Sequence, residues 1–125
     1  MSLEPASVPA IDMGAITQIA ESDDLGDQFI AEIIDVFLGD LQQRLRAIGL
    51  QMSSKDLVGI AATAHSIKGS CGHFGAARLM ELLRRIEDLV KRDPAGLQSA
   101  IDTMVAEAEQ VRAALEAYRS AHAPS

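Results

Sequence analysis

The sequence predicts an all-α protein, an antiparallel up-down-up-down four-helix bundle with a short additional N-terminal helix. Apolar residues recur at spacings of three and four along four long segments, which is the period of amphipathic helices. The composition is 48% hydrophobic but only 3% aromatic, with no tryptophan, so we expect an aliphatic core. Only short polar stretches separate the four segments, and short connections favour antiparallel neighbours.

We expect one domain, because 125 residues are enough for a single hydrophobic core. The bundle should cover residues 12–119. Residues 1–11 contain Pro5 and Pro9 and show little periodicity, so they are predicted to form a flexible lead-in. Residues 120–125 are predicted to form a flexible tail, and the sequence contains no internal repeat.

The first predicted helix is short. Asp12 can cap it, and its apolar positions include Ile16 and Ile19. Asp23 or Asp24 can cap the long second helix. The apolar stripe of that second helix comprises Phe29, Ile30, Ile33, Ile34, Phe37, Leu41, Leu45 and Ile48.

The third helix should follow the polar segment 53–56, where Ser53 with Asp56 resembles a capping box. It should end near Gly72, and Gly75 marks the following turn. Its apolar stripe comprises Leu57, Ile60, Ala64, Ile67 and Cys71.

The fourth and fifth helices are separated by Asp93 and Pro94, which supply an N-cap and a proline at the first helical position. The fourth helix carries Leu79, Leu82, Leu83, Ile86, Leu89 and Val90, and the fifth carries Leu97, Ile101, Met104, Val105, Ala108, Val111, Leu115 and Tyr118. Across the whole bundle, we expect these residues to be buried together: Ile33, Phe37, Leu41, Ile60, Ile67, Leu82, Ile86, Ile101, Val105 and Leu115.

Charge and composition disfavour several functions. The net charge of −7 argues against nucleic acid as the main partner. No apolar run approaches the roughly 18 residues that span a bilayer. One cysteine excludes an internal disulfide and fits a reducing compartment. The N-terminus shows no signal peptide, so we expect a cytoplasmic protein that does not bind a membrane.

The third helix places an unusual group of residues on its outward face. At about 100° per residue, His65 falls roughly 120° from the middle of the apolar stripe. Lys68 and Gly69 follow at i+3 and i+4, which are neighbouring positions on a helix surface. Gly69 and Gly72 each weaken a helix interior by about 1 kcal/mol relative to alanine, so we infer that they provide space. An exposed imidazole with a cation and clear space beside it suits a transiently phosphorylated histidine.

The motif His65-x-x-Lys68-Gly69-Ser70, followed by Gly75-Ala76, resembles the signature of histidine-containing phosphotransfer (HPt) domains of bacterial two-component phosphorelays. The resemblance implies a phosphoprotein in which His65 accepts a phosphoryl group and passes it to or from an aspartate of a response-regulator receiver domain. It also implies that Lys68 lies beside the phosphoryl group and that Gly69 keeps the surface clear.

Many members of this family have a polar residue on the next helix that bonds the second nitrogen of the histidine ring. We place Glu87 at this position. Glutamine is common there, so a carboxylate departs from the family pattern. Two interpretations stay open: Glu87 orients the ring of His65, or it is a solvated member of the charged face of the fourth helix.

The resemblance implies a receiver domain and a hybrid or sensor histidine kinase as partners. We expect a monomer that acts as a phosphotransfer intermediate. It should have no ATP site of its own, because Gly69-x-x-Gly72-x-x-Gly75 is not a phosphate-binding loop: no strand precedes it and no Gly-Lys-Ser/Thr closes it. The chain should bind no cofactor or metal, and the receiver domain would hold a divalent ion such as Mg²⁺.

A partner that reaches His65 must also contact the residues around it. Helix geometry nominates Ala61, Ala62 and Gly72 on the same side. The first helix resembles the family element that packs over one end of the bundle, from which Met13, Ile16 or Ile19 would offer an apolar rim. Alternatively, these three residues simply cover the end of the bundle.

Other classes of function fit the sequence less well. A helical adaptor that binds a signalling partner without phosphotransfer remains the alternative, although binding alone does not require an imidazole. A metal site is disfavoured because His65, Cys71 and His73 do not share one helical face. A Cys-His nucleophile pair is disfavoured because Cys71 points inward. His122 lies in the tail and receives no role.

Overall fold

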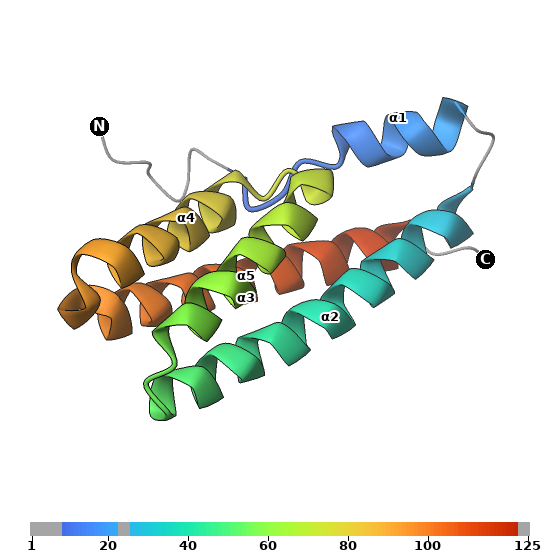
Figure 1. The fold of residues 1–125 in the computed structure, drawn as a ribbon. Coiled ribbons are helices and arrows are strands. Elements are labelled where there is room, and N and C mark those ends of the chain that lie inside the picture. Colours follow the sequence, from blue (N-terminus) through green and yellow to red (C-terminus); the bar gives the residue numbers. More distant parts are fainter. Residues whose placement is uncertain (1–8, 23–25, 123–125) are drawn as a thin grey trace.

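The computed structural model describes residues 9–22 and 26–122. This described part contains helices and no strand (Figure 1), so the predicted all-α class is confirmed. The elements, in chain order, are α1 (Gly14–Ser22), α2 (Asp27–Ser53), α3 (Leu57–Cys71), the 3₁₀ turn η1 (Gly72–Phe74), α4 (Ala77–Arg92), the 3₁₀ turn η2 (Pro94–Gly96) and α5 (Leu97–Ala121).

The four long helices form the predicted bundle. Helix α3 packs against α2 and α4, and α5 packs against the same two helices, so α3 and α5 occupy opposite corners. Each helix runs antiparallel to the one before it (Figure 1). The short α1 contacts α2 and η1, and therefore lies at the end of the bundle where α3 finishes.

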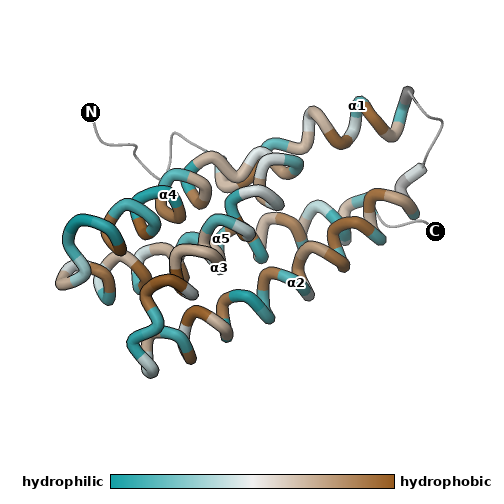
Figure 2. Tube along the Cα trace, viewed as in Figure 1, coloured by the Kyte–Doolittle hydropathy of each residue, from teal (hydrophilic) through white to brown (hydrophobic). Residues whose placement is uncertain are grey.

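The core is mainly aliphatic, as the composition predicts, with Phe37 and Phe74 as its aromatic members. Apolar and hydrophilic residues alternate along each helix in Figure 2, because each helix turns one face inward. The largest fully buried side chains include Ile34, Ile48, Ile60, Ile67, Leu79, Leu83, Ile86, Leu97, Met104 and Leu115. Burying one such side chain contributes about 1.5–3 kcal/mol.

The prediction that Val105 belongs to the core is wrong, because this residue is 43% exposed. Met104 and Ala108 turn into the core, and the position after Met104 lies about 100° further round the helix. Ile33 and Leu82 are half-buried at the edge of the core. The other residues that we expected in the core are buried: Phe37, Leu41, Ile60, Ile67, Ile86, Ile101 and Leu115.

Two predicted helix starts differ from the structure. Asp23 and Asp24, expected to cap the second helix, lie outside the described residues, and the N-cap of α2 is Gly26. The capping box is wrong because Ser53 still belongs to α2. Asp56 alone caps α3, its carboxylate accepting a hydrogen bond of 3.0 Å from the Gly59 N–H.

The connection into α5 also differs. Asp93 is the N-cap of η2 and its side chain makes no capping bond, while Pro94 lies in the first turn of η2. Helix α5 therefore begins three residues after Pro94, at Leu97. It continues to Ala121, beyond the expected boundary at residue 119. Within the described ranges, no helix is both long enough and apolar enough to cross a bilayer.

The turn after α3 ties α1 to the bundle. Gly75 adopts a left-handed conformation with φ of 59°, which confirms the predicted turn. The Asp12 N–H donates a hydrogen bond of 2.8 Å to the Phe74 carbonyl beside it. The Asp12 carboxylate accepts a 2.9 Å bond from the Gly14 N–H and so supports the start of α1. These contacts fix α1 close to the C-terminal end of α3.

Candidate functional site

Helix α3 presents His65 to solvent. The side chain of His65 is 72% exposed, whereas Ile60, Ala64, Ile67 and Cys71 on the opposite face are at most 1% exposed. The inward residues anchor the helix and fix its rotation. The outward direction of the imidazole, predicted from the spacing of apolar residues, is therefore confirmed.

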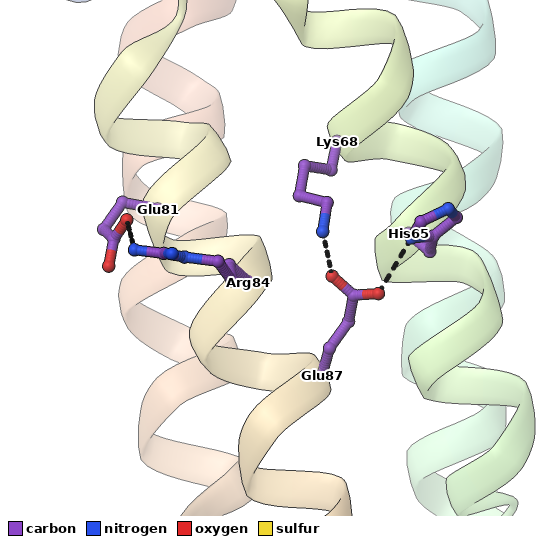
Figure 3. Close-up of polar contacts among 5 residues, drawn as sticks. All are labelled: His65, Lys68, Glu81, Arg84 and Glu87. Atoms are coloured by element: carbon purple, nitrogen blue, oxygen red, sulfur yellow. Dashed lines mark hydrogen bonds and ion pairs between the residues drawn. The ribbon is translucent and has the colours of Figure 1, made fainter.

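One carboxylate on α4 joins the two charged residues of the motif. Glu87 Oε1 lies 2.9 Å from His65 Nδ1, and Glu87 Oε2 accepts a 2.6 Å hydrogen bond from Lys68 Nζ (Figure 3). The side chains of Lys68 and Glu87 are 26% and 20% exposed, so this part of the site is largely covered. The structure thus brings Glu87 to the second ring nitrogen of His65.

Two other charged residues on the outer face of α4 form a separate pair. Arg84 donates a hydrogen bond to Glu81, although Glu87 is equally close in sequence. In Figure 3 both side chains point away from His65. Glu87 is therefore set apart from the solvated charges of its own helix by its contacts across to α3.

The electrostatics of this cluster determine the tautomer of His65. Burial alone would raise the pKa of Glu87, but hydrogen bonds and charge from Lys68 and His65 outweigh it and lower the pKa below its ordinary value of 4.5. Glu87 is therefore ionised at neutral pH, and an ionised carboxylate only accepts hydrogen bonds. His65 Nδ1 must donate to it, and in the neutral ring the lone pair is therefore on Nε2, the other ring nitrogen.

The surface beside His65 is unobstructed. A Cβ atom added at Gly69 or Gly72 would meet nothing within 4 Å outside the local helix backbone, so close packing does not explain either glycine. Gly69, Gly72 and Ala62 are exposed, and Ala61 is half-buried. Small residues therefore lie on the same side of α3 as the imidazole, as their spacing along the helix predicted.

The expected apolar rim on α1 is partly wrong. Met13 precedes α1 and Ile16 lies on its inward face, and both are directed into the core, only 8% and 4% exposed. Neither is available as an exposed docking residue. Ile19 is 49% exposed and remains on the surface.

Sequence reasoning missed a groove of about 650 Å³ beside the site. Helices α1 and α2 contribute Ile19, Phe29 and Val36 to its lining, and α3 contributes Ser66 and Gly69, which follow His65 within one turn. Val36 is 72% exposed. The sequence did contain an indication of this groove. The apolar residues at 29, 30, 33, 34, 36 and 37 form a stripe too wide for one buried face, so part of it must be exposed.

The remaining candidate nucleophile and metal ligands do not join the site. Cys71 is fully buried, and burial raises the pKa of its thiol to about 12. His73 is exposed and lines the groove rather than approaching His65. Among residues 9–22 and 26–122, no group of three or more His, Cys, Asp or Glu is placed to hold a metal ion.

Comparisons with known proteins show the family and the fold. The family model for the Hpt domain matches residues 32–121. The crystal structure of histidine-containing phosphotransfer protein B (HptB) from Pseudomonas aeruginosa PAO1 superposes with a TM-score of 0.80 and 25% sequence identity, covering 91% of this chain and 97% of that one. The comparison with curated proteins finds no match. Residues 32–121 include the complete His65 motif and Glu87, and this chain belongs to the Hpt domain family.

Proposed function

We propose that this chain is a phosphorelay intermediate that accepts a phosphoryl group on His65 and passes it to or from an aspartate of a response-regulator receiver domain. The observation that carries the proposal is the contact between Glu87 and His65 Nδ1 at 2.9 Å. An exposed imidazole without a task needs no such partner from the neighbouring helix. The contact fixes the tautomer and the direction in which the reactive nitrogen points.

The proposed transfer uses Nε2 as the nucleophile. Its lone pair attacks the phosphorus of an aspartyl phosphate, the P–O bond breaks, and the bonding electrons stay with the aspartate carboxylate. Phosphoryl transfer depends mainly on positioning and on stabilising charge. Glu87 orients the ring, Lys68 offsets the phosphoryl charge, and Gly69 leaves room for the partner.

The partner would dock on the small residues around His65 and on the adjacent groove. Ala61, Ala62 and Gly72 flank the imidazole, and Ile19 with Val36 offers exposed apolar surface beside it. Surfaces of this kind suit transient signalling contacts, which often bury less than about 1,200 Å². Met13 and Ile16 would support this surface from beneath.

We infer that partners supply the rest of the chemistry. A hybrid or sensor histidine kinase feeds the relay, and the receiver domain contributes the acidic pocket and a divalent ion such as Mg²⁺. The chain itself would bind no cofactor and no ATP, and would act as a monomer in the cytoplasm. The similar structure, HptB from Pseudomonas aeruginosa, is named a histidine-containing phosphotransfer protein, which supports the proposed role.

The first prediction tests the phosphorylated residue. His65→Gln should abolish labelling by a phosphorylated receiver domain, measured with radioactive phosphate. The helical circular dichroism should not change, because the side chain is 72% exposed and supports no packing. The wild-type label should be labile in acid and stable in alkali, as expected of a phosphoramidate.

The matched controls are His73→Gln and His122→Gln, which should label normally. Undiminished labelling of His65→Gln would refute the assignment. A receiver domain that bound the wild-type chain without any transfer would favour the helical adaptor instead.

A further inference from the structure

The residue that contacts His65 is a carboxylate, and its charge has a consequence beyond orientation. Glu87 holds His65 Nδ1 at 2.9 Å and Lys68 Nζ at 2.6 Å with its two oxygens. An amide at this position would accept the same hydrogen bond from Nδ1 but would carry no charge. The inference below rests on the proposed phosphorylation of His65.

Phosphorylation changes the charge of the imidazole. When Nε2 forms its bond to phosphorus, Nδ1 still carries its proton, so the ring becomes a cation. In the reverse step the P–Nε2 bond breaks and its electrons return to Nε2. A ring that has kept the Nδ1 proton then leaves as neutral imidazole, whereas a ring that has lost it must leave as an anion, which is a much poorer leaving group. The protonated phosphohistidine is therefore the reactive donor.

The geometry points to Glu87 as the counter-ion of this cation: its negative charge keeps Nδ1 of phosphorylated His65 protonated and thereby keeps the phosphoryl group transferable. Two opposite charges at this separation attract each other, and the attraction is stronger near a protein surface than in bulk water. Glu87 is thus a positioning residue whose charge contributes to the reaction separately from its shape.

The surrounding charges leave Glu87 as the anion in contact with the ring. Lys68 on α3 contacts the same carboxylate and opposes its effect on Nδ1. On α4, Arg84 is paired with Glu81, and Asp88 with Arg92. Lys91 shares the outer surface of α4 with Glu87.

Titratable groups also lie on α2, η1 and α5. From α2, Asp40 is paired with Arg44 at 2.7 Å. On η1, His73 lies at the groove. From α5, Glu107 is held by Arg78 of α4 at 3.1 Å. Removal of the Glu87 charge should therefore weaken the binding of the proton at Nδ1 of phosphorylated His65.

The test compares wild type with Glu87→Gln and Glu87→Ala, each in a His73→Gln, His122→Gln background so that His65 is the remaining imidazole. Each protein is phosphorylated with potassium phosphoramidate, and the ³¹P and imidazole ¹⁵N resonances are followed against pH. In Glu87→Gln the midpoint for loss of the Nδ1 proton should fall by roughly one pH unit. The rate of transfer to a receiver domain at pH values above both midpoints should then fall by roughly tenfold.

The two variants separate charge from position. If charge matters, Gln and Ala should both show the lowered midpoint; if Glu87 acts only by orienting the ring, Gln should match wild type, which would overturn the inference. Glu81→Gln, which removes a carboxylate from the same helix but not from His65, should leave the midpoint unchanged. Absence of transfer between wild-type His65 and every receiver would instead count against the proposed function, because chemical phosphorylation does not depend on it.

Discussion

At the scale of single residues, Gly75 is the position with the least freedom near the site. Its φ of 59° belongs to the left-handed region, which costs other residues roughly 1–2 kcal/mol. A Cβ atom there would lie 2.5 Å from Asp12 Cβ and 2.6 Å from the Asp12 carbonyl oxygen. The glycine therefore permits the close approach by which the segment before α1 joins the turn after α3.

The second prediction follows from this contact. Gly75→Ala should lower the free energy of unfolding by about 2 kcal/mol or more, since backbone strain and the clash with Asp12 add together. Urea denaturation followed by circular dichroism measures the loss. Gly72→Ala is the control, because φ at Gly72 is −58° and an added Cβ meets nothing within 4 Å. That control should not lose stability and can gain up to about 1 kcal/mol, because alanine is the better helix former; an equal loss of stability in the two variants would contradict the role of Gly75.

At the scale of elements, α3 separates its two tasks between two faces. Its inward face holds the helix in the bundle, and its outward face carries His65 with Lys68 and several small residues beside it. Gly69 lies one turn beyond His65 on this outward face. Because nothing packs against it, its side of the helix is free for a partner.

The third prediction concerns this free surface. Gly69→Leu should slow transfer from a receiver domain, because the larger side chain obstructs approach to His65 without disturbing the core. Gly69→Ala should keep the transfer rate closer to wild type and can stabilise the helix by up to about 1 kcal/mol. Gly49→Leu adds the same side chain at an open, exposed position elsewhere on α2 and should transfer normally. Wild-type rates in Gly69→Leu would show that the glycine does not provide clearance.

On helix α5, two neighbouring residues differ sharply in their exposure to solvent. Met104 is fully buried, and its neighbour Val105 is 43% exposed. The fourth prediction is that Met104→Ala lowers the free energy of unfolding by about 2–5 kcal/mol, because it leaves a cavity in the core. Val105→Gln should change it by less than about 0.5 kcal/mol. Thermal or urea unfolding of the pair checks both values, and a large cost at Val105 would contradict the observed rotation of α5.

At the scale of the whole molecule, the bundle places the site and α5 on opposite corners. Helix α3 has α2 and α4 as neighbours, and α5 closes the ring behind them. The groove lies between α1, α2 and the C-terminal part of α3, on the same side as Gly69. A partner that covers His65 can therefore reach the groove without touching the outer face of α5.

The fifth prediction is the extent of this docking surface. In an NMR titration with a receiver domain, the resonances of Ile19, Ala62 and Gly69 should move, and that of exposed Glu109 on α5 should stay unchanged. Ala62→Arg should weaken binding without unfolding the protein, because Ala62 is exposed. Movement on α5 with Ala62 and Gly69 unaffected would require a different docking surface.

The sequence by itself determined what depends on local periodicity. The spacing of apolar residues set the five helices, the inward stripe from Ile60 to Cys71 and the outward direction of His65. These features follow from the geometry of one helix, in which neighbours lie three and four residues apart. The motif around His65 could be recognised from the sequence for the same reason, because His65, Lys68 and Gly69 lie on one helix.

Only the tertiary structure decided which side of each wide apolar stripe is covered and which residues meet across helices. Burial of Met13 and Ile16, with Ile19 and Val36 left exposed, depends on how α1 and α2 are rotated against α3 and η1. The contact of Glu87 with His65 and Lys68 likewise spans about twenty residues of sequence and two helices. Periodicity fixes positions around one helix axis, but the relative rotation and depth of two helices result from the packing of all their side chains together.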